Sequence, residues 1–476
     1  MKHLEVDVAV IGAGSAGLRA FRKASEWTDK VVLIEGGPHG TTCARVGCMP
    51  SKLLIAAAES AHAVQQAPKF GVETDGVRID GVAVMRRVRS ERDRFVSFVV
   101  GGVEEIPAAK RLSGYAKFVD DHRLEVGGHT TVTADRVVIA TGSTPVIPPF
   151  LQVLGDRLVV NDDVFDWQDL PRSVAVFGPG IIGLELGQAL KRLGVDVIMF
   201  GRGGPVGPLT DPELLAVAAD IFGNEYYLDA DADVERVERT ANGVRIKYVG
   251  HDGVVTSKDV DYVIAATGRQ PNVSGLELNN TSLPLDAAGV PDFDPATLRV
   301  AETHVFIAGD VSNFRPVLHE AADEGTLAGI NAGRFPDVQS RKRSSPLSIV
   351  FTDPQIAMVG TRYADIRPTK VVVGEVSFAD QGRSRVMLKN EGLLRIYADI
   401  ASGRFLGAEM LGPRAEHIGH LLAWSHQAGM TIAQMLKMPF YHPVIEEGLR
   451  TALRDAQAKL DNLRHQADVS VEISVA

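Results

Sequence analysis

The chain contains very little cysteine. Its 476 residues include two, Cys43 and Cys48, and both lie in the stretch "TTCARVGCMPSK" at positions 41–52. Two cysteines with no histidine ligand pattern nearby are a poor basis for a zinc site. Free cysteine often packs as a small apolar residue, so the neighbouring residues must decide between an inert role and a redox role for the pair.

Long apolar runs are also absent. No stretch approaches the roughly 18 apolar residues of a membrane span, and the start "MKHLEVDVAVIGAG" lacks the basic-then-apolar layout of a signal peptide. We therefore expect a cytoplasmic protein with no membrane partner. Structural disulfides are rare in that compartment, where a cysteine pair is more often catalytic or metal-binding. A redox role is the leading hypothesis for Cys43 and Cys48.

The chain also lacks an excess of positive charge. The sequence has 50 basic and 60 acidic residues, which gives a net charge of −10. This balance argues against a nucleic-acid surface, for which a basic stripe is expected. Apolar residues make up 45% of the chain and charged residues 23%, as in an ordinary soluble globular protein. The length predicts about three domains of roughly 150 residues each.

The N-terminal stretch "VDVAVIGAGSAGLRA" carries a glycine motif between a predicted strand and a predicted helix. Gly12 allows a tight turn, Gly14 lets the backbone approach a pyrophosphate, and Gly17 lets the helix pack closely on the strand. The next apolar strand ends at Glu35, about where an acid binds a ribose hydroxyl. The stretch therefore predicts a dinucleotide site.

The same spacing returns in "SVAVFGPGIIGLELGQALKRLGVDVIMFGRGG", with Gly178, Gly180 and Gly183. Here Gly201 takes the place of the acid at the end of the next strand, and Arg202 follows. An acid at this place binds the free ribose hydroxyl of NAD, whereas an arginine accepts the 2′-phosphate of NADP. This tilts the second site toward NADP(H). The alternative is that "GRGG" is a flexible turn with a solvated arginine.

Three further strand patterns support two redox carriers in one chain. "VVIATGSTPVIPP" (137–149) and "YVIAATGRQPN" (262–272) each end in Ala-Thr-Gly and a proline-containing turn. "THVFIAGDVSN" is an apolar strand that ends at Asp310. A carboxylate in this place can bind a ribityl or ribose hydroxyl, or it can cap the next turn.

Together these motifs resemble the class-I pyridine nucleotide-disulfide oxidoreductases, most of all the dihydrolipoamide dehydrogenases, with glutathione reductase as a close relative. The resemblance extends over nearly the whole chain and implies an α/β fold. Two Rossmann-like dinucleotide domains, one inserted in the other, would precede a C-terminal α+β dimerisation domain. The implied boundaries are 1–150 and 273–345 for the FAD domain, 151–272 for the NAD(P) domain and 346–476 for the interface domain.

The family carries its redox-active disulfide in a Cys-x4-Cys stretch followed by Pro-Ser-Lys, as in "CARVGCMPSK". In an ideal helix, Cα atoms five positions apart lie roughly 8–9 Å from each other, beyond the roughly 7 Å limit for a disulfide. We therefore expect a loop or distorted turn at Gly47. Pro50 suits the first turn of the following helix, which places Cys48 near a helix N-terminus, where a thiolate is stabilised.

The resemblance implies a role for each sulfur. Cys48 would be the flavin-proximal sulfur and Cys43 the interchange thiol that attacks or releases substrate. Lys52 would lie near the flavin and pair with Glu185 of the second glycine-motif helix, itself implied at the nucleotide site.

Histidine suits the acid/base role because it titrates in the useful pH range. Near the C-terminus, "MPFYHPVIEEGLRTALRDA" resembles the family's His-Pro motif, which makes His442 the implied acid/base and Glu447 its orienting carboxylate. Glu446 is the adjacent alternative, and Glu447 is preferred on spacing alone. In a family homodimer this histidine reaches the other subunit's active site. The family often reads His-x-His-Pro-Thr, whereas this chain has Phe440-Tyr441-His442-Pro443-Val444; the apolar neighbours are expected to affect substrate access without removing the base.

The resemblance implies further contacts for both cofactors. The FAD contacts are Glu35 at the adenosine ribose, Ala116 at the adenine, Thr141, Gly142, Leu318 and His319 near the flavin, and Asp310 at the ribityl chain. The implied NAD(P) contacts, besides the second glycine motif and Arg202, are Gly268 and Arg269.

The function implied is oxidation of dihydrolipoamide to lipoamide with NAD(P), through FAD and the Cys43–Cys48 disulfide. The substrate would be a small dithiol or the lipoyl domain of a 2-oxoacid dehydrogenase complex. Three alternatives stay open: an NADPH-dependent reductase of glutathione or another low-molecular-weight disulfide, a transhydrogenase or quinone-reducing flavoenzyme, and an idle binding subunit. Mercuric and high-molecular-weight thioredoxin reductases need extra C-terminal cysteines, which this sequence lacks.

Overall fold

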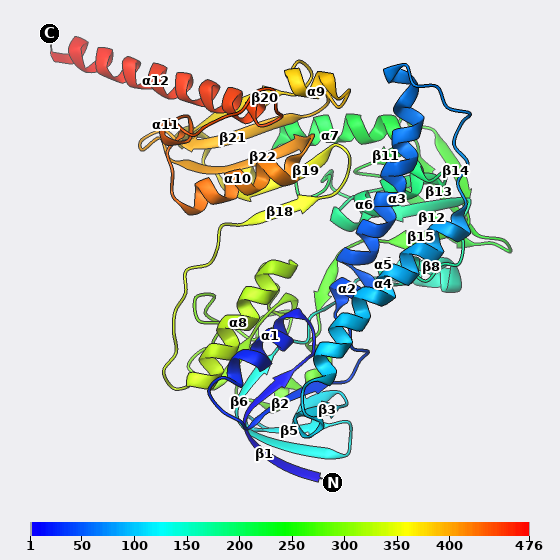
Figure 1. Cartoon of the computed structure of the whole chain (residues 1–476), viewed down its shortest axis with the longest axis vertical. Helices are drawn as coiled ribbons and strands as arrows, with labels where there is room; N and C mark the ends of the chain where they lie inside the picture. Colours follow the sequence, from blue (N-terminus) through cyan, green and yellow to red (C-terminus); the bar gives the residue numbers. More distant parts are fainter. Residues whose placement is uncertain (1, 476) are drawn as a thin grey trace.

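The computed structural model describes the backbone of residues 2–475 and the side chains of residues 2–466. Figure 1 shows three lobes, with the N-terminal sheet at the bottom and two further sheets above it. Among the residues described, no helix is both long and apolar enough to cross a membrane. Side chains after residue 466, in the predicted interface domain, lie outside the described residues.

The first lobe is a mostly parallel sheet with helices packed on it. Its main elements are β1 (Lys2–Ile11), α1 (Ser15–Ala24), β2 (Val31–Glu35), β3 (Arg111–Ser113), β4 (Ala116–Phe118), β5 (Arg123–Val126), β6 (Thr130–Ile139), β17 (Val305–Ile307) and α8 (Leu318–Arg334). The strand order is β3-β2-β1-β6-β5-β4, and β17 pairs with β6. The last four residues of β1 are all buried, as expected of a central parallel strand.

The second lobe has another parallel sheet, with the strand order β11-β10-β9-β15-β8. Its elements are β8 (Leu158–Val159), β9 (Ser173–Phe177), α6 (Ile181–Arg192), β10 (Asp196–Phe200), α7 (Pro212–Glu225), β11 (Tyr227–Asp229), β12 (Val234–Arg239), β13 (Val244–Val249), β14 (Val255–Val260) and β15 (Tyr262–Ala265). β12, β13 and β14 form a separate antiparallel sheet. The chain enters this lobe after β7 (Ser143–Pro145) and leaves it at β16 (Arg269–Pro271), and these two strands pair with each other.

The third lobe is an antiparallel sheet of order β18-β19-β22-β21-β20. Its elements are β18 (Leu347–Val350), β19 (Gln355–Gly360), β20 (Val371–Ser377), α9 (Gly382–Val386), β21 (Leu393–Asp399), β22 (Phe405–Gly412), α10 (Ala415–Gln427), α11 (Ile432–Met435) and α12 (Glu447–Val475). α12 packs closely on β20 because Gly374 has no side chain: a Cβ there would lie 2.3 Å from the carbonyl oxygen of Ala452. The three lobes confirm the predicted fold class.

We propose the predicted boundaries as the domain limits: 1–150 with 273–345, 151–272, and 346–476. The pairing of β7 with β16 supports an inserted second domain, because the strands that lead into and out of it lie side by side.

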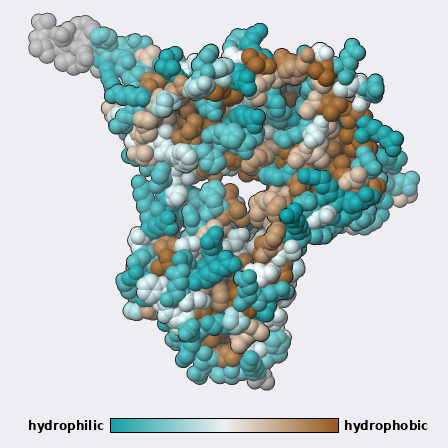
Figure 2. Space-filling view, in the orientation of Figure 1, coloured by the Kyte–Doolittle hydropathy of each residue, from teal (hydrophilic) through white to brown (hydrophobic). Residues whose placement is uncertain are grey.

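Two helices link the first and second lobes, α3 (Cys48–Gln66) and α4 (Gly81–Glu104). Leu54 and Ala58 of α3 belong to the same hydrophobic cluster as Leu184 of α6. The helix that starts at Cys48 is therefore fixed against the helix of the second glycine motif. The space-filling view is hollowed between the lower lobe and the upper lobes (Figure 2).

Close backbone contact holds α1 against α8. A Cβ on Gly325 would lie 2.1 Å from the carbonyl oxygen of Ala16, and a Cβ on Gly329 would lie 2.4 Å from that of Ala20. Real Cβ atoms do not approach oxygen this closely, so both positions require glycine. The spacing of four residues puts both glycines on one face of α8.

We predict that Gly325→Ala destabilises the protein, because α1 and α8 must separate to admit the methyl group. Overpacking of this kind costs about 1–3 kcal/mol. Gly101→Ala in α4 is the matched control, since a Cβ there meets nothing within 4 Å, and alanine in a helix should stabilise it slightly. Thermal unfolding of both variants checks this; equal midpoints would contradict the packing argument.

Candidate active site

The loop between β1 and α1 is shaped for a phosphate group. A Cβ on Gly12, whose φ is +105°, would lie 2.3 Å from the carbonyl oxygen of Ala140, and one on Gly17 would lie 1.8 Å from that of Gly12. A Cβ on Gly14 meets nothing within 4 Å. The outer glycines thus serve the tight turn and the packing, while the middle one borders open space at the N-terminus of α1. This arrangement fits a dinucleotide pyrophosphate.

Glu35, at the end of β2, lies beside this loop. Its carboxylate accepts hydrogen bonds from the backbone N–H groups of Ala13, at 2.7 Å, and Gly37, at 2.8 Å. The structure adds Tyr115, which the sequence reasoning missed. Its ring is 76% exposed and packs on Gly36, directly before the buried Ala116 of β4. The signal available in the sequence was an aromatic residue directly before the predicted adenine contact, Ala116.

The predicted flavin end lies just after β6 and β17, beside the paired strands β7 and β16. The Thr141 hydroxyl donates to the carbonyl oxygen of Asn272 at 2.7 Å, and Gly142 has a φ of +71°. Ser143 Oγ donates to Asp310 Oδ2 at 2.8 Å, and Arg269 Nε donates to Ser143 Oγ at 2.9 Å. Arg269, the first residue of β16, therefore reaches across to β7 and is linked through Ser143 to Asp310.

The N-terminus of α8 carries the two remaining predicted FAD residues. Leu318 and His319 are its first residues, and both are exposed.

The loop between β9 and α6 repeats the first one. A Cβ on Gly178 would lie 2.3 Å from the carbonyl oxygen of Ala266, and one on Gly183 would lie 1.9 Å from that of Gly178, whereas one on Gly180 meets nothing within 4 Å. Gly268 also borders open space and has a φ of +110°.

Gly201, at the end of β10, has no room for an acidic side chain. A Cβ there would lie 2.4 Å from the carbonyl oxygen of Ala230. Arg202 follows, exposed, and the next residue, Gly203, donates its N–H to Asp231 at 2.6 Å. The backbone packing explains why this site lacks the acid that usually binds the ribose of NAD.

The two cysteines lie on opposite sides of a helix break. Cys43 is in α2 (Thr42–Val46), Cys48 is the first residue of α3, and Gly47 between the two helices has φ −127° and ψ −115°. A Cβ on Gly47 would lie 3.0 Å from the carbonyl oxygen of Thr42, so glycine allows this tight return of the chain. The break and the place of Cys48 at a helix N-terminus agree with the sequence analysis.

The two cysteines form no disulfide with each other in this structure, and their thiols have different pKa values. The hydrogen bond from the Cys43 side chain, helped by the charge of Lys52, lowers the pKa of Cys48 to about 7. The same hydrogen bond, together with burial, raises the pKa of Cys43. Near neutral pH Cys48 is therefore partly ionised, whereas Cys43 keeps its proton.

Lys52 connects the cysteine helix to the second dinucleotide segment. Its Nζ lies 2.7 Å and 2.9 Å from the two carboxylate oxygens of Glu185, which is 4% exposed. Glu185 also accepts the N–H of Phe351 at 3.0 Å, and the ammonium group lies 4.5 Å from the centre of the Phe351 ring. All three predicted lobes thus meet at this ion pair.

His442 and Glu447 form a second pair. His442 Nδ1 lies 3.0 Å from both carboxylate oxygens of Glu447, and the Val444 N–H donates to Glu447 at 3.3 Å. The hydrogen bond with His442 lowers the pKa of Glu447. The His442 side chain is 80% exposed, so its Nε2 edge is available to a molecule outside this chain. The geometry favours Glu447 over Glu446 as the orienting carboxylate.

Sequence comparisons match this arrangement to a family. Residues 6–325 match the pyridine nucleotide-disulphide oxidoreductase family, and residues 347–453 match its dimerisation domain. The chain belongs to this family. Its members use FAD and NAD(P), and the dimerisation domain supports a homodimer.

Named relatives cover almost the whole chain. Dihydrolipoyl dehydrogenase 2 of Haloarcula marismortui is 28% identical over 472 residues, 96% of this chain and 98% of the relative. A mercuric reductase of Shigella flexneri is 30% identical over 467 residues, 94% of this chain and 80% of the relative. The relatives establish a flavin-dependent disulfide oxidoreductase.

Two solved structures share the fold. LpdA from Mycobacterium tuberculosis has a TM-score of 0.80 at 24% identity and covers 94% of this chain and 99% of its own. The Cu(II) complex of the flavoprotein disulfide reductase RclA from Escherichia coli has a TM-score of 0.79 at 22% identity, with 95% and 99% covered.

We predict that Cys43→Ala raises the pKa of Cys48 from about 7 toward its ordinary value, because the hydrogen bond that stabilises the thiolate is lost. The reactive thiolate at pH 7 should fall severalfold. The pH dependence of iodoacetamide alkylation of the reduced protein measures this, with Cys43→Ser, which keeps a donor, as the control. An unchanged midpoint in the alanine variant would contradict the assigned hydrogen bond.

Proposed function

We propose that this protein oxidises dihydrolipoamide, free or on the lipoyl domain of a 2-oxoacid dehydrogenase complex, to lipoamide with NAD(P)⁺. The proposal rests chiefly on the two cysteines on either side of the break at Gly47, where the pKa of Cys48 is lowered and that of Cys43 is raised. The dihydrolipoyl dehydrogenase relatives, which span nearly the full chain, support this substrate. A cytoplasmic location suits a site that must cycle through free thiols.

The cysteines perform the dithiol–disulfide exchange. In the oxidised protein, one substrate thiolate attacks Cys43 Sγ and breaks the Cys43–Cys48 bond, which leaves a mixed disulfide on Cys43 and a thiolate on Cys48. The second thiolate of the substrate then attacks the first substrate sulfur, which is bonded to Cys43, and breaks that bond. The substrate loses two electrons and two protons and leaves as a disulfide, and Cys43 and Cys48 are reduced.

FAD, when bound, supplies the two-electron relay between the cysteine pair and the nicotinamide nucleotide. The residues that would hold it are the glycines of the first motif, Glu35 and Asp310. Lys52 keeps a positive charge beside Cys48, and buried Glu185 fixes that ammonium group. The thiolate is therefore stabilised by a charge that cannot easily move away.

His442 is proposed as the base that takes the proton from the substrate thiol. Glu447 holds Nδ1, which leaves Nε2 as the proton acceptor and favours the protonated ring once the proton has moved. Its 80% exposure supports a site shared across a homodimer, in which His442 serves the cysteine pair of the partner subunit.

Reduction of a low-molecular-weight disulfide with NADPH is the second candidate function. The observation in its favour is the packing at Gly201, which excludes an acid at this position and is followed by the exposed Arg202. Glutathione reductases usually carry a second arginine six residues later, where this chain has Pro208. Reduction of mercuric ions, known from the names of relatives, is disfavoured because the chain has two cysteines and no further pair.

Steady-state kinetics separates the two candidates. With dihydrolipoamide and NAD⁺ or NADP⁺ we expect turnover that depends on the thiol, and with glutathione disulfide and NADPH we expect little. Cys48→Ser should abolish the thiol reaction and keep some diaphorase activity with an artificial acceptor. Turnover with glutathione disulfide alone, or full lipoamide activity in Cys48→Ser, would overturn the proposal.

We further propose NADP(H) as the preferred nucleotide. Arg202→Glu should then raise the KM for NADP(H) by about tenfold or more, since one favourable charge contact becomes a repulsive one, and should change the KM for NAD(H) much less. Arg236→Glu, on an exposed part of β12, controls for net charge. Equal KM changes for both nucleotides would contradict a contact with the 2′-phosphate, and no change in either KM would assign Arg202 to the solvent.

A further inference from the structure

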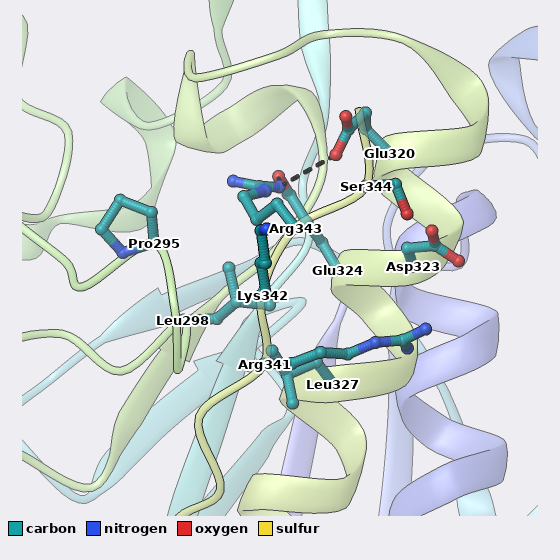
Figure 3. A pocket seen from close by; sticks show the side chains of 10 residues that line it. All are labelled: Pro295, Leu298, Glu320, Asp323, Glu324, Leu327, Arg341, Lys342, Arg343 and Ser344. Atoms are coloured by element: carbon teal, nitrogen blue, oxygen red, sulfur yellow. Dashed lines mark hydrogen bonds and ion pairs between the residues drawn. The ribbon is translucent and has the colours of Figure 1, made fainter. Parts of the chain in front are cut away.

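Four charged residues form a cluster at the start of α8 and in the segments on either side of this helix. This cluster consists of Arg315, Glu320, Glu324 and Arg343. Glu320 and Glu324 are each only 3% exposed, and the Arg343 guanidinium reaches both carboxylates (Figure 3). Arg315 lies 3.1 Å from Glu320. Burying a carboxylate costs free energy unless it is paired and hydrogen-bonded. Two buried carboxylates in one cluster therefore indicate a specific structural role.

Glu324 makes a contact that Glu320 does not make. Its Oε2 accepts the backbone N–H of Gly309 at 2.6 Å, while its Oε1 pairs with Arg343. Gly309 has a φ of +83° and directly precedes Asp310. The carboxylate thus fixes the turn that aims Asp310, whose own Oδ2 accepts the Ser143 hydroxyl at 2.8 Å.

Arg343 brings the connection to the third lobe into this contact. It lies in residues 335–346, the segment that connects α8 to β18 and hence to the lobe that carries His442. Its guanidinium also stacks over the Phe314 ring, 4.7 Å from the ring centre. One carboxylate therefore bridges the turn before Asp310 and the connection to the third lobe.

We propose that Glu324 is a positioning residue for FAD, which holds the Gly309–Asp310 turn in its binding conformation and, through Arg343, couples that turn to the connection with the third lobe. Because such coupling is reciprocal, FAD binding and the anchoring of residues 335–346 strengthen each other. Glu324 itself touches the backbone and Arg343, and acts on the cofactor through Asp310.

Glu320 provides a matched control. It lies on the same helix, is equally buried, and pairs with the same Arg343, but its described contacts do not include the Gly309 turn. Removal of either carboxylate should cost similar stability. Removal of Glu324 alone should affect the cofactor site.

Titration of the apoprotein with FAD, followed by flavin fluorescence, tests the proposal. We expect Glu324→Ala to raise the Kd for FAD by about tenfold, the effect of one lost hydrogen bond to a charged acceptor, and Glu320→Ala to raise it less than about threefold. Glu324→Gln keeps an uncharged and therefore weaker acceptor for the Gly309 N–H, and should recover part of the affinity. Thermal midpoints of the apoproteins show whether the two alanine variants are equally destabilised.

Equal Kd changes in the two alanine variants, or no change in Glu324→Ala, would overturn the proposal. If the alanine variants do not fold, Glu324→Gln and Glu320→Gln replace them. Hydrogen exchange of the Gly309 amide in the holoenzyme is then the readout: faster exchange in Glu324→Gln alone supports the proposal, and equal exchange in both variants overturns it.

Arg343→Met should raise the Kd for FAD more than Arg315→Met; the reverse order would refute the coupling.

Discussion

The hydrogen bond between the Cys43 and Cys48 thiols is the interaction on which the proposed chemistry depends. It lowers the pKa of Cys48 to about 7 and raises that of Cys43, so the two sulfurs differ in reactivity although both are cysteines of one short segment. This contact exists because the chain turns back at Gly47 between α2 and α3. In an uninterrupted helix the two side chains would point in different directions.

The same geometry explains why the cysteine pair lies between two dinucleotide segments. α3 starts at Cys48 and packs on α6, so Lys52 of the first lobe meets Glu185 of the second. The Phe351 N–H, from the third lobe, binds the same carboxylate. A buried acid therefore holds three segments and one cation together, and the cation supports the Cys48 thiolate. Breaking a buried pair of this kind leaves an uncompensated charge and is strongly destabilising.

A second buried acid, Glu324 of α8, plays a comparable part within the first lobe. Both acids accept a backbone N–H with one oxygen and bind a cation from a different segment of the chain. The proposed catalytic histidine differs from them, because His442 is exposed and its carboxylate lies on its own segment. This contrast is consistent with different roles: Glu185 and Glu324 act within one subunit, whereas His442 serves the partner subunit.

The sequence by itself determined the α/β fold class, the family, and the elements that carry the two glycine motifs, because local spacing dictates tight turns and helix packing. It also paired Lys52 with Glu185 and His442 with Glu447, through the resemblance, and the distances agree with both pairs. Only the tertiary structure decided where Arg269 lies, that Tyr115 packs beside Glu35, that Gly201 cannot carry an acid, and that Glu324 joins Gly309 to Arg343. These four depend on contacts between residues far apart in the chain, and no local spacing encodes such contacts.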